Sequence, residues 1–297
     1  MTSFPVTGID VSRWQKSIDW QKALHQGISF AFVKASQGSS IIDSQFERNM
    51  QETARLGIPR GIYHFFKPEV DWEKQANLFI GLIRGWDFEL DAVVDIERDG
   101  GLSKTALNSV LEKFTSQVES RTGRRLMIYT SPGFWNGAMP LTDWAHERRL
   151  WIAHWTRNPA PTIPQEWHRH GAQWTFWQWS AKNQEGQNHG AATKSIDLDR
   201  FYGSMAYFHA LYNLPTPPDP APAPQPGTAA AFEVLPLSLH IFTAPDVNSR
   251  IVGELEKGDV VSVCNLSGTD EVWIEVEHDA WVLFAYNGRQ LLSRISP

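Results

Sequence analysis

Short apolar runs alternate with amphipathic segments along the first two-thirds of the chain, a pattern typical of strands that alternate with helices. Strands are predicted at residues 30–35, 60–66, 92–97, 125–129 and 150–155. Helices are predicted at residues 44–56, 72–84 and 103–121, the last with Ser103 as its N-cap. This alternation favours an α/β fold, closed as a TIM-like (β/α) barrel. The runs at 175–179 and 195–199 have no clear helix between them, so we expect the barrel to be irregular there.

A proline-rich segment marks a change of pattern. Seven of the twelve residues from Pro215 to Pro226 are proline, and such a stretch forms an extended, semi-rigid spacer. Beyond it, short runs at 238–242, 251–255, 260–264, 272–277 and 280–284 are broken by turn residues, which predicts a small all-β barrel. We therefore expect an α/β domain at residues 1–213, a linker at 214–226 and a second domain at 227–297.

Charge is divided unevenly between the two domains. Residues 227–297 hold ten acidic and four basic side chains, whereas residues 1–213 hold 22 acidic and 23 basic ones. The chain shows no basic patch, which argues against a nucleic-acid partner. No run approaches the roughly 20 apolar residues of a membrane span, and Met1–Pro5 lacks the pattern of a signal peptide. We expect a monomer made in the cytoplasm, which reaches an outside target only after release or non-classical export.

Tryptophan and cysteine usage narrows the possible chemistry. Twelve of the fourteen tryptophans precede residue 180. Such clusters most often form core, but they also supply flat platforms on which sugar rings stack. The single cysteine, Cys264, excludes an internal disulfide and a cysteine-based zinc site. Its apolar neighbours indicate a small buried hydrophobic residue rather than a nucleophile.

Two acids stand at the end of the predicted strand 92–97. Residues two apart on a strand point to the same face, so Asp95 and Glu97 would project side by side, roughly 6–7 Å apart. Carboxylates held that close cannot both ionise freely, and one tends to keep its proton. A protonated acid beside an ionised partner is what glycosidic bond cleavage requires. Taken alone, the motif is equally consistent with two solvated acids at an ordinary strand end.

Other polar residues also follow predicted strands, and in parallel barrels the working groups lie at those carboxyl ends. The further candidates are Asp10, Lys34, His64, Tyr129, Trp151, His154, Gln178 and Asp197. Four acids from separate regions fit a glycosidase cleft. Metal binding by the same acids is the competing interpretation, but no His-x-x-x-His motif or Asp-rich loop supports it, so we expect no metal and no cofactor. Ser-His-Asp catalysis is disfavoured because the chain has no Gly-x-Ser-x-Gly motif.

Eight ordered segments carry a resemblance to a known family: GIDVSRWQ (8–15), FVKASQG (32–38), GIYHF (61–65), VDIE (94–97), IYT (128–130), LWIA (150–153), WQW (177–179) and IDLDRF (196–201). Together they resemble the signatures of glycoside hydrolase family 25, the Chalaropsis-type lysozymes or N-acetylmuramidases. The resemblance spans nearly all of residues 6–210. It implies an irregular (β/α) barrel with an acidic groove, which cleaves the β-1,4 bond from N-acetylmuramic acid to N-acetylglucosamine in bacterial peptidoglycan.

The resemblance also implies roles for individual residues. Glu97 matches the general acid, and Asp95 matches the neighbouring carboxylate that acts as nucleophile or orients the substrate's acetamido group. Asp10 and Asp197 match two further acids of the site. The family's cleft positions are matched by Tyr63, Tyr129, Trp151 and Gln178, and we add the strand-end residues Lys34 and His64 as substrate-binding candidates. A role in the barrel core is the alternative for each of these.

The C-terminal region resembles a bacterial SH3-like domain, a class that commonly binds cell-wall peptides. The first strand carries His240-Ile241-Phe242 where the class usually has Asn-x-Arg, and the domain is acidic. Because of these departures, the resemblance supports an SH3-like fold for this region better than it supports a cell-wall peptide as its ligand.

Three functional hypotheses follow. The first is a muramidase joined to a wall-targeting module; the second is a non-catalytic carbohydrate-binding protein; the third is a glycosidase of chitin-like polymers. A phage endolysin and a bacterial lytic enzyme or effector would share this organisation.

Overall fold

The structure is a computed structural model that describes residues 4–181, 184–215, 231–235, 238–246, 249–262, 265–267, 271–277, 280–286 and 289–294. The chain divides into two compact units, residues 1–54 with 58–204 and residues 55–57 with 205–297. Most of the proposed linker, from residue 216 onward, and Cys264 lie outside the described residues. Among the described residues no helix has the length and apolar character needed to cross a membrane.

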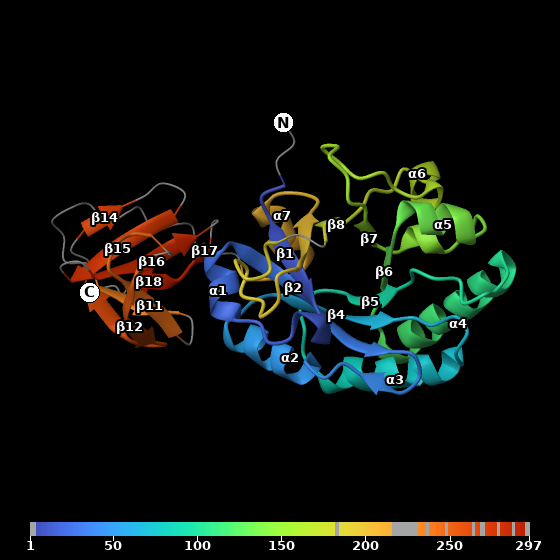
Figure 1. The fold of residues 1–297 in the computed structure, drawn as a ribbon, viewed down its shortest axis with the longest axis horizontal. Helices are drawn as coiled ribbons and strands as arrows, with labels where there is room; N and C mark the ends of the chain where they lie inside the picture. The colour runs from blue at the N-terminus through green and yellow to red at the C-terminus, as the bar shows by residue number, and fades with distance from the viewer. Residues whose placement is uncertain are drawn as a thin grey trace. The chain divides into compact units, whose positions relative to one another are not determined.

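The first unit is built on a closed barrel of eight strands, which confirms the predicted irregular α/β barrel (Figure 1). Its strands are β1 (Thr7–Val11), β2 (Ile28–Gln37), β4 (Arg60–Phe65), β5 (Ala92–Asp95), β6 (Met127–Thr130), β7 (Leu150–Ala153), β8 (Phe176–Ser180) and β9 (Asp197–Phe201). They neighbour one another in that order, and β1 pairs with both β2 and β9 to close the ring. A short strand, β3 (Ile41–Ile42), extends β2 as a hairpin.

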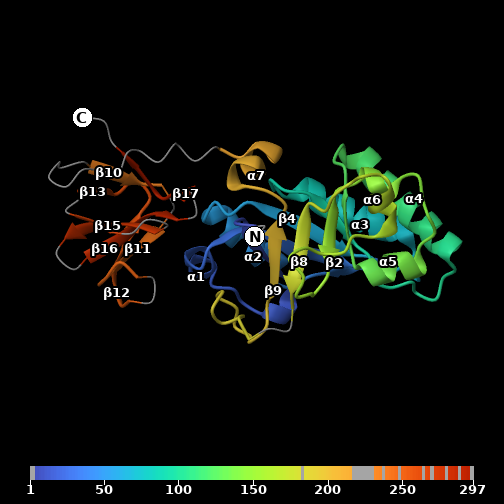
Figure 2. The ribbon, with the colours of Figure 1, turned by 90° about the horizontal axis from the view of Figure 1, so that it is seen from above.

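The irregularity lies where the sequence pattern indicated. Apart from the short β3, the strands from β1 to β8 pair in parallel, but β9 runs antiparallel to both β8 and β1. The described residues between β8 and β9 contain no helix. Figure 2 shows β9 beside β8 in this part of the barrel. A reversed last strand brings the residues at the start of β9 to the same end of the barrel as the carboxyl ends of the parallel strands.

Helices connect the parallel strands and cover the outside of the barrel (Figure 1). They are α1 (Trp20–His25), α2 (Phe46–Arg55), α3 (Trp72–Gly85), α4 (Lys104–Thr122), α5 (Pro132–Ala138) and α6 (Gln165–Arg169), with 3₁₀ turns η1 (Arg13–Gln15) and η2 (Ala145–Glu147). Ser103 caps α4 as predicted, because its side chain accepts the N–H of Ala106. The helix ends at Gly123, whose φ of 69° is the left-handed conformation that favours glycine.

Aromatic side chains fill the barrel interior. The ring of Phe32 stacks on Trp151 with centroids 4.4 Å apart and meets Phe176 edge-on at 5.0 Å. The Phe30 ring leaves no space for a side chain at Gly8, where an added Cβ would lie 2.3 Å from it. These packed aromatic rings lie beneath the polar groups at the end of the barrel and hold them in place.

The described residues of the second unit from Met205 onward form one helix, α7 (Met205–Leu211), and small antiparallel sheets. One sheet has the order β13-β10-β18, and the other has the order β12-β11-β16-β15-β14, with β17 paired to β16. The strands are β10 (Ala231–Val234), β11 (Ser238–Phe242), β12 (Ile251–Glu256), β13 (Val260–Ser262), β14 (Asn265–Ser267), β15 (Glu271–Glu277), β16 (Ala280–Tyr286), β17 (Arg289–Gln290) and β18 (Leu292–Arg294). A core that includes Phe232, Phe242, Trp273 and Phe284 holds these strands together. The SH3-like assignment of this unit stays a prediction.

Candidate active site

Asp95 and Glu97 lie at the carboxyl end of β5, at the mouth of the barrel. The backbone around them is fixed, since the N–H of Ile96 donates to the carbonyl of Tyr129 at 3.0 Å and the carbonyl of Asp95 accepts from Phe66 at 2.8 Å. Asp95 is only 4% exposed, whereas Glu97 is exposed. The two carboxyl groups interact through their charges, since the charge of Glu97 raises the pKa of Asp95. The pair therefore has one buried member and one that faces solvent.

A second group of acids comes from β1 and β9. Asp10 lies opposite Asp197 in the antiparallel pairing of these strands. Asp199 is two residues along β9, so it shares a face with Asp197, and it is fully buried. The Asp199 carboxyl accepts a hydrogen bond from Trp151 Nε1 at 2.8 Å. The charges of Asp197, Asp199 and Asp95 all raise the pKa of Asp10, so the three aspartates of β1 and β9 lie close together at the barrel mouth.

Gln178 joins this acidic group to the aromatic residues of the cleft. Its Nε2 donates to Asp10 Oδ2 at 2.7 Å, and its Oε1 accepts from Tyr129 Oη at 3.0 Å and Trp155 Nε1 at 3.2 Å. Because the hydroxyl and indole groups here donate, the amide oxygen must face them and the amide nitrogen must face Asp10. Gln178 thus holds Asp10 in place.

The aromatic residues lie beneath the acids. Tyr129 and Tyr63 meet the Trp151 ring edge-on, with centroids 4.5 Å and 6.1 Å from it. Trp151 is buried and acts on the site through its hydrogen bond to Asp199. Burial raises the pKa of both tyrosines well above the usual range, so their hydroxyl groups stay protonated. Trp155 differs, because its ring is 58% exposed at the edge of the cluster.

Lys34 provides positive charge next to the paired carboxyl groups. Its Nζ donates to Gln37 Oε1 at 3.1 Å and lies 4.8 Å from the centre of the Phe65 ring. Burial lowers the pKa of Lys34, and the charge of Asp95 partly opposes that shift. In turn, the Lys34 charge favours the ionised forms of Asp95 and Glu97.

The acids of the cluster hold their protons more tightly than free carboxyl groups do. Burial is the main cause for each, and it raises the pKa of Asp10, Asp95 and Asp199 well above the usual range. Neighbouring charges add to this, from Asp197 onto Asp10 and from Glu97 onto Asp95. The pKa of Glu97 is raised as well, and that of Asp197 rises to about 6. Such a cluster holds both protonated and ionised carboxyl groups near neutral pH, as acid catalysis at a glycosidic bond requires.

His64 lies apart from this cluster. Its Nδ1 lies 2.8 Å from Ser36 Oγ, its Nε2 lies 3.2 Å from Gln75 Oε1, and its ring stacks on Phe114 of α4. Burial lowers the pKa of His64 to about 4, so the ring is neutral. The side chain packs between the barrel wall and the helices, and the structure does not bring it to the proposed substrate-binding residues. His154, another strand-end candidate, accepts the N–H of Thr162 at Nδ1 and holds the loop after β7.

Two residues of the cluster were not among the sequence-based candidates. Asp199 has the same signal as the Asp95–Glu97 pair, a spacing of two along a strand, but only Asp197 was selected from that strand. Trp155 follows directly after the predicted strand end at His154, and no pattern distinguished it from the other tryptophans.

The comparison with known families settles what kind of protein carries this site. The sequence profile described as glycosyl hydrolases family 25 matches residues 9–187, more than half of the chain. This chain belongs to glycosyl hydrolases family 25. The matched region contains Asp10, Asp95 and Glu97, whereas Asp197 and Asp199 lie beyond its end. The family resemblance carried by the eight segments is thereby confirmed.

Individual relatives agree with the family assignment. The chain is 36% identical to Lysozyme M1 of Streptomyces globisporus over 219 residues, which cover 70% of this chain and 71% of that protein. It is 29% identical to the N,O-diacetylmuramidase of Chalaropsis sp over 207 residues, 65% of this chain and 96% of that one. The structure of the bacterial lysozyme from Streptomyces coelicolor aligns with a TM-score of 0.62 and 33% identity, covering 72% of this chain and all of that one. The chain is a family 25 glycoside hydrolase of the lysozyme type.

Proposed function

We propose that this family 25 hydrolase cleaves the β-1,4 bond between N-acetylmuramic acid and N-acetylglucosamine in bacterial peptidoglycan. The observation that carries the proposal is the convergence of Asp10, Asp95, Glu97, Asp197 and Asp199 at one end of the barrel, beside exposed and buried aromatic rings. The names of the relatives, a lysozyme and an N,O-diacetylmuramidase, support the same bond and polymer.

Glu97 is the proposed general acid. It is the exposed member of the Asp95–Glu97 pair, so its carboxyl can reach a glycosidic oxygen that Asp95 cannot. In the free enzyme the shared proton resides on Asp95, whose pKa is raised further by burial and by the Glu97 charge. When the N–H of a substrate acetamido group donates to Asp95, it stabilises the ionised form of that residue. The proton then passes to Glu97, which delivers it to the leaving oxygen.

The burial of Asp95 favours an orienting role for this residue. In retaining glycosidases with a nucleophilic carboxylate, both carboxyl groups must reach the scissile bond, one on each side of it. Asp95 is only 4% exposed, so it is poorly placed to attack a sugar carbon but can accept a hydrogen bond from a substrate group that lies against it. We therefore propose that Asp95 positions the acetamido group of N-acetylmuramic acid, whose own oxygen attacks the anomeric carbon as the Glu97 proton moves to the leaving oxygen. Water then opens the resulting oxazolinium ring, with Glu97 as base.

The remaining residues of the site bind the sugar rings and stabilise the transition state. Positive charge develops on the sugar ring in the transition state, and ionised Asp197 and Asp10 would stabilise it electrostatically. We propose Tyr63, Tyr129, Gln178 and Lys34 as the polar contacts of the sugars. The exposed ring of Trp155, held by its hydrogen bond to Gln178, is suited to stack on one of them.

A pair of variants tests the proposal. Glu97→Gln keeps the size and hydrogen bonding of the side chain but removes the transferable proton, so lysis of purified cell walls should fall by about 10²–10⁴-fold. Glu73→Gln, an exposed acid on α3, is the matched control and should keep full activity. Mass spectrometry of the wild-type digest should find N-acetylmuramic acid at the reducing ends. N-acetylglucosamine at those ends, or undiminished lysis by Glu97→Gln, would refute the proposal.

We further propose that residues 227–297 bind the cell wall and that the monomeric enzyme reaches it after release from the cell in which it is made, as an endolysin would. The resemblance of this region to bacterial SH3-like domains supports this organisation, as does its separation from the barrel by a proline-rich segment.

A further inference from the structure

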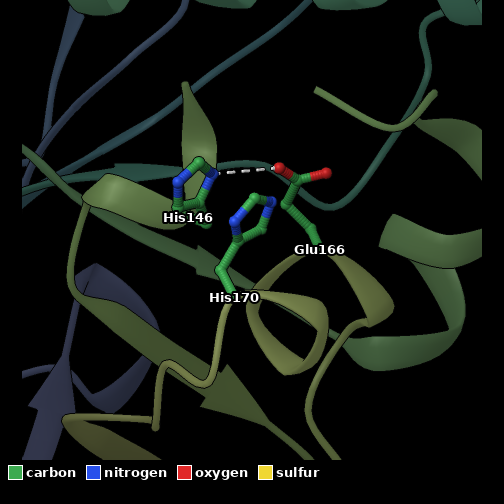
Figure 3. A group of neighbouring side chains, drawn as sticks. All are labelled: His146, Glu166 and His170. Carbon is green, nitrogen blue, oxygen red and sulfur yellow. Dashed lines mark hydrogen bonds and ion pairs between the residues drawn. The ribbon is translucent and has the colours of Figure 1, made fainter. Parts of the chain in front are cut away.

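Three side chains with metal-ligating atoms meet on the outside of the barrel (Figure 3). His146 lies on η2, Glu166 lies on α6, and His170 lies at the end of α6. Glu166 and His170 are four residues apart, a spacing that places both on one side of a helical turn. One ligand atom from each of the three lies within 4.8 Å of the other two.

The carboxyl group of Glu166 is buried and only partly satisfied. Its Oε2 accepts the N–H of Thr142 at 2.8 Å, while its Oε1 faces His146 Nδ1 at 3.4 Å, a long contact. The residue is 2% exposed. A buried carboxylate is costly unless a cation compensates it, and a single contact of 3.4 Å to an imidazole does so poorly.

The two imidazole rings are stacked, with centroids 3.5 Å apart and planes 5° from parallel. The nitrogen lone pairs lie in the ring planes, so one ion cannot be coordinated by both rings as they stand. His170 is exposed at the end of its helix, so its ring is free to change rotamer when an ion binds, and one of its nitrogens already lies within 4.8 Å of the ligand atoms of His146 and Glu166. Figure 3 shows both rings beside that oxygen.

The backbone that carries the three residues is well anchored. Trp167 Nε1 donates to the carbonyl of Arg148 at 2.9 Å, which ties α6 to the segment after η2. The N–H of Ala145 donates to Thr142 Oγ1 at 3.3 Å, and Thr142 is also the residue whose N–H orients Glu166. A hydrogen bond that orients a ligating carboxylate is characteristic of protein metal sites.

We propose that His146, Glu166 and His170 bind a divalent transition-metal ion of the zinc class. Two imidazoles and one carboxylate suit zinc and its neighbours, whereas calcium and magnesium prefer ligands that are all oxygen. The ion joins η2 to α6. His146 precedes β7 and His170 precedes β8, so the site lies toward the amino ends of these parallel strands, opposite the acidic cluster. In barrels of this kind that end serves stability, and the ion is therefore structural.

Zinc titration of the full chain, after removal of metals with a chelator, tests the proposal. Calorimetry should find one saturable site, and saturating zinc should raise the melting temperature. His170→Ala, at an exposed position where folding is not at risk, should weaken binding by at least about tenfold and reduce the thermal shift at the same zinc concentration. His168→Ala, an exposed histidine of the same helix, should leave both unchanged.

A second control separates this site from the barrel mouth. Glu97→Gln alters the acidic cluster and should retain the same zinc affinity as the wild type. Equal zinc binding by His170→Ala and the wild type, or loss of binding in Glu97→Gln, would overturn the proposal. So would the absence of any saturable site.

Discussion

Five carboxyl groups compete for protons within a small volume at the barrel mouth. Burial raises the pKa of each, and repulsion by neighbouring carboxylates raises it further for the four aspartates. A carboxyl group whose pKa is raised in the native state is harder to ionise there than in the unfolded chain, so its ionisation lowers the free energy of unfolding. The site therefore costs stability at the pH at which it holds the charges needed for catalysis, a trade-off that is common at active sites.

Asp197 permits a direct measurement of this cost. Its pKa rises from the ordinary value of 3.8 to about 6. Its contribution to stability is complete below about pH 4 and is lost as the pH rises through about 6. Asp197→Asn mimics the protonated form, so it should be more stable than the wild type by about 1–3 kcal/mol above pH 6. Urea denaturation at several pH values measures this, with the exposed Asp143→Asn as control; a difference that is independent of pH would contradict it.

The same group should shape the pH dependence of activity. If ionised Asp197 stabilises the transition state, kcat/KM for a soluble muropeptide should rise through an apparent pKa of about 6 and fall again when the Asp95–Glu97 pair loses its shared proton. Asp197→Asn should lower the maximum and remove the acid limb while leaving the alkaline limb in place. An unchanged acid limb in that variant would assign it to another group.

At the residue scale, one spacing rule selected the candidate acids. The spacing of two along a strand selected Asp95 and Glu97, and the same rule applied to Asp197 would have selected Asp199. It also separates His64 from Tyr63, because adjacent strand residues face opposite sides of a sheet. Tyr63 lies against Trp151 inside the barrel, so His64 lies outside, against α4. The hydrogen bonds of Gln178 depend on atoms from three strands, which no local pattern encodes.

At the scale of elements, long periodic segments were predicted well. Residues 103–121 were expected to be helical and α4 spans Lys104–Thr122, while the strand expected at 92–97 ends as β5 at Asp95. The short helices α5 and α6 were not predicted, because five to seven residues give too little periodicity to recognise. The sequence pattern also could not predict the antiparallel direction of β9, since the direction of a strand follows from the segment that connects it to the previous strand rather than from its own residues.

Close packing inside β1 leads to a prediction for the barrel as a whole. A Cβ at Gly8 would lie 2.3 Å from the buried ring of Phe30, so Gly8→Ala should destabilise the protein by about 1–3 kcal/mol. Gly81→Ala is the matched control, because a Cβ on that face of α3 meets open space. It should instead stabilise by up to about 1 kcal/mol through helix propensity. Thermal denaturation of both variants provides the measurement, and equal effects would contradict this account of Gly8.

At the scale of the whole molecule, two regions of different character share one chain. The barrel region is nearly neutral, whereas residues 227–297 are strongly acidic. An acidic surface does not favour attraction to the phosphates of a bacterial wall. If the second region binds walls, it must do so through specific contacts, so its binding should depend only weakly on salt.

A variant truncated after residue 214 tests whether the barrel alone catalyses and residues 227–297 bind the wall. The variant keeps every residue proposed for catalysis, so kcat/KM on soluble fragments should equal that of the full chain. On intact walls the full chain gains from two linked binding events, and the truncated form should bind about 100-fold more weakly. A full-length variant in which a Gly/Ser segment of equal length replaces residues 215–226 controls for the linker, and its wall binding should stay close to that of the wild type.

Sedimentation with purified walls measures binding, and circular dichroism checks folding. A truncated protein that does not fold would refute the two-domain division, and one that binds walls as the full chain does would refute the binding role of residues 227–297.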